Sequence, residues 1–176
     1  MNILICKSTD YRLQFENEKL ISRCKEYPNK FIDKLLDANQ LNFKTYDNYS
    51  IHVKGLVKIV RNVPFGTKLS IETFKKQRGQ WLPTVYNIYR SDLCLAAFSS
   101  QEPWHVMSDN LPPEQKACPA KKNTILRVNS LSNIVIKDLP SKNLAGDYKI
   151  TMTATSPTDP TDLLCGDIFA TAIRMN

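Results

Sequence analysis

The chain has 176 residues, of which 42% are hydrophobic and 23% charged, and its formal net charge is +7. This length suits one domain with its own core, and this composition excludes an intrinsically disordered chain. No stretch approaches the ~18–20 apolar residues of a membrane-spanning helix, and the scattered basic residues lack the clustering that a nucleic-acid track requires.

The N-terminal segment Met1–Ser8 opens with a short apolar run. This run is shorter than the ~7–15 apolar residues of a complete signal peptide, so we interpret residues 1–8 as a signal-peptide remnant of a truncated start. Residues 9–176 are then a single domain. A strand is predicted at Tyr11–Phe15, where apolar and polar residues alternate. The spacing in Phe31–Asp37 fits either one amphipathic helical turn or an irregular sheet edge.

The clearest strand is Ile51–Val60, because its apolar residues recur with a period of two. One face carries Ile51, Val53, Val57 and Ile59, and the other carries His52, Lys54 and Lys58. After a turn at residues 62–66, a strand pair is predicted at Lys68–Phe74 and Gln80–Tyr89, separated by the basic turn Lys75–Gly79. We expect Trp81, near the start of the second of these strands, to lie in the core.

The strand pattern stops between Cys94 and Cys118. Leu93–Phe98 favours a helical turn by propensity, and Pro103 then interrupts it. Beyond Cys118, another strand pair is predicted at Thr124–Val128 and Ile134–Ile136.

The C-terminal region predicts a hairpin. Tyr148, Ile150, Met152 and Ala154 alternate with polar residues, residues 156–160 form the turn, and Leu164–Ala170 is the last strand. Because Cys165 lies inside this strand, we expect a cross-link to a distant segment, which indicates an oxidising, extracellular compartment. Eight or so short strands predict an all-β fold, a two-sheet antiparallel sandwich or cup.

Several of these segments resemble a known family. Leu139-Pro140-Ser141, Gly146-Asp147-Tyr148-Lys149-Ile150 and the Cys165 strand are similar to the C-terminus of the GM2-ganglioside activator family and of its insect relatives, the CheB chemosensory proteins. Asn87–Cys94 and Ala117-Cys118-Pro119 are similar to the paired-cysteine segment of that family. The resemblance covers roughly Tyr11 to Asn176, and five cysteines rather than eight place the chain nearer to the insect group.

The resemblance implies a lipid-recognition β-cup with two disulfides. Cys94–Cys118 would clamp a short helical mouth loop, Cys24 would pair with Cys165, and Cys6 would be left over. In such a cup the inner face would bind a hydrophobic ligand, and the candidates for it are Val57, Ile59, Leu69, Ile71, Val85, Ile150 and Phe169. Phe98, Trp104 and Met107 are the candidates for the mouth. Each inner-face candidate equally fits an ordinary sandwich core, and Trp104 equally fits a cap on that core.

The sequence contains no motif for catalysis, a cofactor or a metal site. We expect both histidines, His52 and His105, to be surface or loop residues, and we expect no enzymatic activity. Asn48-Tyr49-Ser50 is a glycosylation sequon, consistent with export.

By resemblance, the predicted function is extracellular, non-enzymatic binding of a lipid or cuticular hydrocarbon pheromone in gustatory perception. A membrane surface and a chemosensory receptor or channel are further expected partners, and nucleic acid is not. The alternative is a lipid-presenting activator of a hydrolase or a lipid-transfer accessory protein. A third class, a cytosolic basic module that binds nucleic acid, requires free thiols and a filled core.

Overall fold

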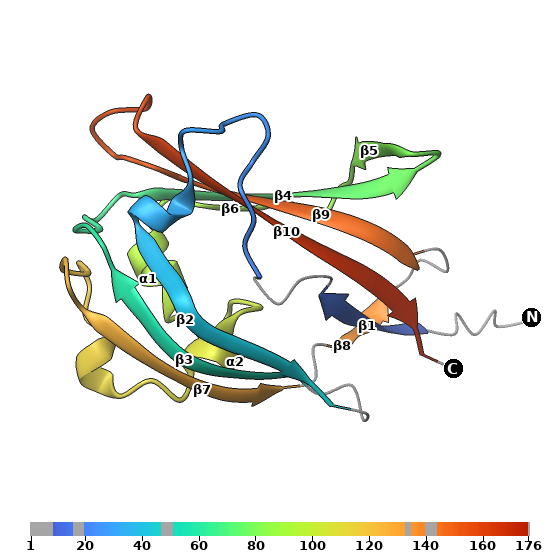
Figure 1. Cartoon of the computed structure of the whole chain (residues 1–176), viewed down its shortest axis with the longest axis horizontal. Helices are drawn as coiled ribbons and strands as arrows, with labels where there is room; N and C mark the ends of the chain where they lie inside the picture. Colours follow the sequence, from blue (N-terminus) through green and yellow to red (C-terminus); the bar gives the residue numbers. More distant parts are fainter. Residues whose placement is uncertain (1–8, 16–19, 47–50, 133–134, 140–143, 176) are drawn as a thin grey trace, which may run out of the picture.

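The computed structural model describes residues 9–15, 20–46, 51–132, 135–139 and 144–175. It is an all-β sandwich of two antiparallel sheets, which confirms the predicted fold class (Figure 1). The larger sheet has the order β5 (Gln80–Pro83), β4 (Lys68–Gln77), β9 (Gly146–Thr155), β10 (Leu163–Arg174), β1 (Thr9–Phe15) and β8 (Val135–Leu139), and β6 (Ile88–Arg90) also pairs with β4. The smaller sheet has the order β2 (Leu36–Thr45), β3 (Ile51–Ile59) and β7 (Ile125–Ser132).

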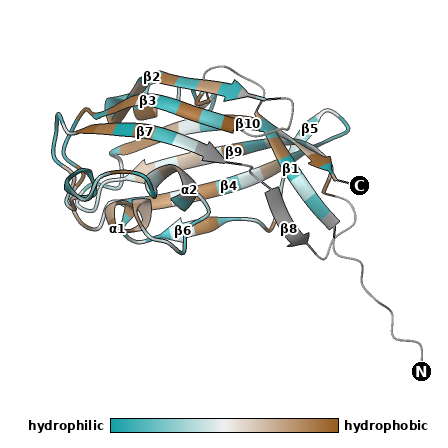
Figure 2. Cartoon of the chain, turned by 90° about the horizontal axis from the view of Figure 1, so that it is seen from below, coloured by the Kyte–Doolittle hydropathy of each residue, from teal (hydrophilic) through white to brown (hydrophobic). Residues whose placement is uncertain are grey.

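Four short helices complete the described elements: η1 (Ile32–Lys34), α1 (Leu93–Ala97), α2 (His105–Ser108) and η2 (Pro113–Gln115). Three of them lie in the excursion clamped by the Cys94–Cys118 disulfide, so the short helical, clamped loop is confirmed. The loop begins with an N-cap, because the Asp92 carboxylate accepts a hydrogen bond of 3.1 Å from the backbone N–H of Leu95. Figures 1 and 2 both place α1 and α2 on the side of the sandwich between β7 and β6.

The strand registers show why each sheet has one apolar face. Directly opposed residues of antiparallel strands point to the same side. In the large sheet Ile71 is opposite Met152, and Met152 is opposite Gly166. In the small sheet Val53 lies between Phe43 and Ser130. Apolar and polar bands alternate along β2 and β3 in Figure 2, as expected for strands with one face toward a core.

Two clusters of buried side chains hold the sheets together. The first joins both sheets at the η1 end, through Ile32, Leu35, Ile59, Val63, Ala154 and Leu164. The second joins the small sheet to the clamped excursion, through Ile51, Val53, Leu111 and Val128, with Phe15, Phe98 and Met107 packed against them. The sandwich is therefore closed at one end by the first cluster and along the β7 side by the second.

Three predictions about the strands need correction. Thr124–Val128 and the described part of Ile134–Ile136 do not pair with each other, because β7 pairs with β3 and β8 pairs with β1. The predicted strand Gln80–Tyr89 is divided into β5 and β6. The basic turn is also shorter than predicted, because β4 extends to Gln77 and leaves a two-residue turn whose residues both have positive φ.

Other parts of the prediction are confirmed. β1, β3 and the C-terminal hairpin lie where alternation placed them, and β9 and β10 pair over ten positions. Both alternatives for Phe31–Asp37 hold in part, because a 3-10 turn, η1, leads directly into the edge strand β2. Most of β2 was not predicted, since the polar residues before Leu41 obscure its period. Residues 1–8, which include the leftover Cys6, lie outside the described residues, and so does the Asn48 sequon.

Candidate functional site

An apolar hollow of about 540 Å³ opens on the side of the sandwich where β2 forms the edge of the small sheet. We call it the β2 hollow. The structure describes twelve of its lining residues, and eight of these are apolar: Leu20, Ile21, Phe31, Ile32, Leu36, Ala38, Leu41 and Phe43. The other four are Ser22, Arg23, Asp33 and Asn39. Its volume falls within the about 300–1,000 Å³ that small-molecule sites occupy.

Segment 20–23 forms one wall of the β2 hollow. It runs beside β10 and pairs with it as an additional edge of the larger sheet. Within the described residues, β1 pairs with β10 as far as the Phe15–Ala170 pair, so the first half of β10 has no pairing with the described part of β1. Ser22 pairs with this half of β10, because its backbone exchanges hydrogen bonds of 2.7 and 2.9 Å with Asp167. Further along the chain, the Lys30 carbonyl makes a second contact with β10, since it accepts a hydrogen bond of 2.6 Å from the backbone N–H of Cys165.

Gly166 allows this segment to approach the sheet. A Cβ atom at Gly166 would lie 2.6 Å from Cγ2 of Ile21 and 3.0 Å from Cγ2 of Ile32. The absence of a side chain therefore makes room for both isoleucines on the inner face of β10. Ile21 and Ile32 then form the part of the hollow nearest the large sheet.

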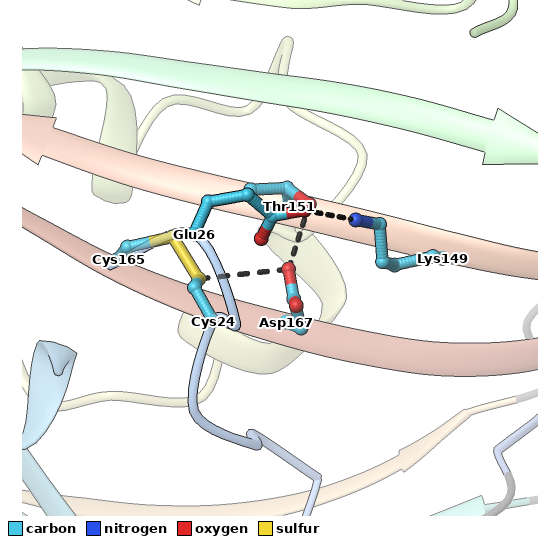
Figure 3. The surroundings of a disulfide bond; sticks show 6 residues. All are labelled: Cys24, Glu26, Lys149, Thr151, Cys165 and Asp167. Atoms are coloured by element: carbon cyan, nitrogen blue, oxygen red, sulfur yellow. Dashed lines mark hydrogen bonds and ion pairs between the residues drawn. A yellow bond between two sulfur atoms is a disulfide. The ribbon is translucent and has the colours of Figure 1, made fainter. Parts of the chain in front are cut away.

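The Cys24–Cys165 disulfide fastens the same segment from the opposite face of β10 (Figure 3). Cys24 is 1% exposed and Cys165 is 0% exposed, and the bridge spans 141 positions of the sequence. Both disulfides that the resemblance implied are thus present in the structure. Oxidised cysteines are incompatible with the free thiols that the cytosolic alternative required.

A buried acid lies beside this disulfide. Asp167 is 2% exposed, and its Oδ1 accepts a hydrogen bond of 2.6 Å from the Thr151 hydroxyl (Figure 3). The same Oδ1 is 3.5 Å from Sγ of Cys24, which is a contact rather than a hydrogen bond because a disulfide sulfur carries no proton. Burial raises the pKa of Asp167 above its ordinary value, and it outweighs the lowering by Thr151 and Lys149.

Lys149 brings a positive charge to this cluster. Its side chain is only 10% exposed, and its Nζ is 3.2 Å from Oε1 of the more exposed Glu26. The pKa of Glu26 is lowered, first by a hydrogen bond from its own backbone N–H and then by Lys149. Since Glu26 follows Cys24 by two residues, this ion pair also ties the segment beyond the disulfide to the outer face of β9.

The buried Asp167 predicts a pH dependence of stability. At pH values between the pKa of Asp167 in the unfolded chain and its raised pKa in the folded protein, the folded protein binds more protons than the unfolded chain. The contribution of Asp167 to stability is therefore fully present below about pH 4 and is lost as the pH rises through the folded pKa. Asn does not titrate, so we expect Asp167→Asn to lack this loss of stability. Its free energy of unfolding should therefore rise relative to that of the wild type between pH 4 and pH 7. Urea unfolding at several pH values measures the difference.

Asp159→Asn is the matched control, because the pKa of Asp159 is lowered by hydrogen bonds from Thr161. That carboxylate contributes stability above the unfolded pKa and loses it as the pH falls, so its variant should show a change of the opposite sign. A pH profile of Asp167→Asn parallel to that of the wild type would contradict the assignment.

The rim of the β2 hollow is polar. Nη2 of Arg23 is 3.5 Å from Oδ2 of Asp33, and the guanidinium lies 4.7 Å from the centre of the Phe31 ring. Arg23 is largely exposed, so this pair contributes little to stability. It gives the hollow an apolar interior and a charged edge, the arrangement that suits a ligand with an apolar body and a polar end.

The ten predicted ligand-contacting residues lie elsewhere. Ile59, Leu69 and Ile71 are buried, whereas Val57, Phe98 and Met107 pack against the second core cluster. The indole N–H of Trp104 donates to the Ala96 carbonyl at 3.2 Å, which ties this half-buried ring to α1. Ile150 lines a separate, smaller pocket.

Two of the seven residues predicted on the inner face were wrong. Val85 is 88% exposed, because it lies in the loop between β5 and β6 and not in a strand. Phe169 points to the outer face, since it is opposite Lys149, whereas Ile168 is opposite the inward Ile150. The Phe169 ring instead lies 5.9 Å from that of Trp81, which is half-buried there and not in the core.

The residues that line the β2 hollow were not identified from the sequence. They lie on the segment 20–23, on η1 and on β2, none of which has a long regular alternation. The signal that was present is the pair Leu41 and Phe43, two residues apart in a polar stretch. Reading this pair as the apolar face of an edge strand would have found one wall of the hollow.

Groups that could support chemistry are engaged in other contacts. Cys24, Cys165 and Asp167 lie close enough together for a metal site, but the two sulfurs are bonded to each other and cannot act as thiolate ligands. Nε2 of His52 is 2.9 Å from the Asn129 side chain, and Nε2 of His105 is 3.3 Å from Asp109. None of these contacts tests the expected lack of enzymatic activity, which stays a prediction.

Comparison of the chain with protein-family models and with curated proteins finds no match. Among the helices that the structure describes, none has the length and apolar character needed to cross a membrane.

Proposed function

We propose that this protein binds an elongated hydrophobic molecule, a lipid or a hydrocarbon, in the β2 hollow and does not transform it. The observation that carries the proposal is the hollow itself, about 540 Å³ with eight apolar residues among its described lining. An unfilled hollow of this kind forfeits packing contacts, and an acyl or hydrocarbon chain restores them at about 0.8 kcal/mol per buried methylene.

The charged rim suggests how such a ligand is oriented. Arg23 and Asp33 are held at the edge of the hollow, while Leu36, Leu41 and Phe43 lie on the β2 side of its interior. An apolar chain placed among these side chains would leave a hydroxyl, ester or carboxyl end near the rim and in contact with water. The proposed ligand therefore has one apolar chain and at most one small polar end.

An extracellular location is part of the proposal. Two buried or half-buried disulfides support it, because such bonds persist in oxidising compartments. The resemblance to the CheB proteins extends the proposal to chemosensation, with a cuticular hydrocarbon or related pheromone as the ligand. This extension to a family and to a sensory role is supported by the sequence motifs alone.

A second candidate, presentation of a lipid to a membrane or to a hydrolase, is favoured by one surface feature. Leu82, Val85, Tyr86 and Tyr89 are exposed large hydrophobic residues on β5, on β6 and in the loop between them. Basic residues Lys76 and Arg78 are exposed beside them on the β4–β5 hairpin. Faster transfer of ligand between anionic vesicles, lost on Val85→Asp, would distinguish this role from simple binding.

The β2 hollow predicts that a bulky residue at Ala38 blocks binding. Ala38 is a half-buried lining residue, and Ala38→Trp places an indole in the hollow. We expect the affinity for a fluorescent fatty acid, and for hexadecanol measured by its displacement, to fall about tenfold or more. Ala145→Trp is the control, since Ala145 is exposed and lines neither hollow.

The thermal midpoints of both variants show whether each is folded. If Ala38→Trp is folded and binds the fluorescent fatty acid as tightly as the wild type, the ligand does not occupy the β2 hollow.

A further inference from the structure

A second apolar hollow, of about 190 Å³, lies on the inner face of the large sheet. Its lining residues are Tyr11, Leu13, Thr73, Tyr86, Leu144, Tyr148, Ile150 and Ala172, and we call it the tyrosine pocket. Among the described residues, it shares no lining residue with the β2 hollow. Apart from Leu144, these lining residues come from β1, β4, β9, β10 and the loop between β5 and β6, whereas the β2 hollow is lined in part by η1.

The floor of the tyrosine pocket is built by four neighbouring strands. Thr73 of β4 is opposite Ile150 of β9, and Leu13 of β1 is opposite Ala172 of β10. Ala172 is in turn opposite Gly146. Small side chains at the centre of this floor, between larger ones on both sides, make the depression.

Two buried phenols form one wall and are held by the same backbone. Tyr11 is 1% exposed and Tyr148 is 7% exposed. The Tyr148 hydroxyl donates to the Leu144 carbonyl at 2.7 Å, and the Tyr11 hydroxyl accepts from the Leu144 N–H at 3.4 Å. Their polar atoms are thus turned to the backbone of Leu144, which leaves the ring surfaces to face the pocket.

The opposite wall is Tyr86, which the loop between β5 and β6 positions. The backbone N–H of Thr84 donates to the Thr73 carbonyl at 2.8 Å, and the N–H of Thr73 donates to the Asn87 side chain at 3.1 Å. Both bonds fasten the loop to β4 on either side of Tyr86. The Tyr86 side chain, 42% exposed, then stands between the pocket and the solvent.

We propose that the tyrosine pocket is a second ligand site, which takes one compact, uncharged molecule with a single aromatic or branched apolar ring. An apolar cavity of about 150 Å³ is large enough to bind benzene, and this pocket is slightly larger. None of the lining residues that the structure describes is charged at neutral pH, so among them a charged ligand would lose hydration without gaining a partner. Three tyrosine rings offer edge and face contacts to an aromatic guest.

This proposal does not depend on the β2 hollow being occupied. Toluene is the probe, and the readout is the shift of the Ala172 and Ile150 methyl signals in a methyl-labelled sample of the full chain. We expect saturable shifts at these two methyls, and about tenfold weaker binding in Ala172→Leu, which fills the floor. Tyr86→Ala, at an exposed position, should also weaken binding and should fold without difficulty.

Ala38→Trp separates the two sites, because it blocks the β2 hollow and leaves the tyrosine pocket intact. We expect it to bind toluene with wild-type affinity. Three results would overturn the proposal: no saturable shift at Ala172 and Ile150, unchanged toluene affinity in both Ala172→Leu and Tyr86→Ala, or loss of toluene binding in Ala38→Trp. The first two results would not bear on the binding of a long-chain ligand in the β2 hollow.

Discussion

Replacing Cys24 and Cys165 together by alanine is expected to lower the free energy of unfolding by roughly 2–5 kcal/mol and to abolish ligand binding in the β2 hollow. The bridge closes a loop of 141 positions, so its removal releases a large conformational entropy in the unfolded chain. It also frees segment 20–23, which then keeps the backbone pairing of Ser22 with Asp167 and the packing of Ile21 on Gly166. Urea unfolding and the fluorescent fatty acid measure the two effects.

The Cys94–Cys118 bridge provides the control. It spans 24 positions, and the loop-closure contribution is about 3.5 kcal/mol for a loop of that length against about 5 kcal/mol for the longer one. Cys94→Ala/Cys118→Ala should therefore lose less stability, and it should keep the β2 hollow, whose lining includes no residue of the clamped excursion. Retained fatty-acid binding in Cys24→Ala/Cys165→Ala would show that the segment does not need the bridge.

Gly55→Ala is expected to lose about 3 kcal/mol or more of unfolding free energy. Gly55 lies in the middle of β3 with a φ of +143°, which side chains rarely tolerate. A Cβ there would lie 1.9 Å from the Gln40 carbonyl oxygen and 3.1 Å from Cα of Leu41, both backbone atoms. Because backbone cannot rotate away, β2 and the wall of the hollow that it forms would have to move.

Gly79→Ala is the matched control for this effect. Gly79 also has a positive φ, +81°, but a Cβ there would meet nothing within 4 Å. Its cost is then only the left-handed conformation, about 1–2 kcal/mol. Equal losses in urea unfolding for the two variants would indicate that the close approach of β2 to Gly55 is not what constrains this strand.

The sequence predicted the elements in which alternation is uninterrupted. β3 and the β9–β10 hairpin were identified because their period of two runs for most of a strand, and a hairpin needs only local contacts. Both disulfides followed from the resemblance. Composition and turn signals were enough for a two-sheet, all-β fold.

Pairings between distant strands could not be predicted in the same way. Periodicity tells which residues of one strand share a face, but it does not say which sheet the strand joins. β7 and β8 are neighbours in sequence, yet they pair with β3 and β1 in different sheets. In β2 a register shift between Asp37 and Gln40 interrupts the alternation, so the strand gave no regular signal.

The candidate site was missed for the same physical reason. Its walls come from the bulged strand β2 and from segment 20–23, which pairs with β10 through Ser22 and Asp167, beyond the described pairing of β1. The predicted ligand contacts were taken from the most regular strands, and those side chains mostly fill the core instead. Val85 and Phe169 show the two ways in which this fails: a strand assigned where the chain forms a loop, and a side chain assigned to the wrong face.

The central claim is that segment 20–23, η1 and β2 line a space for a hydrophobic guest. Native mass spectrometry of the protein, exported from an oxidising compartment and incubated with a mixture of lipids and long-chain hydrocarbons, tests it most directly. The account predicts a protein mass lowered by two disulfides and a one-to-one complex with a single-chain apolar molecule, which Ala38→Trp fails to form. A correctly oxidised protein that carries no adduct from this mixture would contradict it.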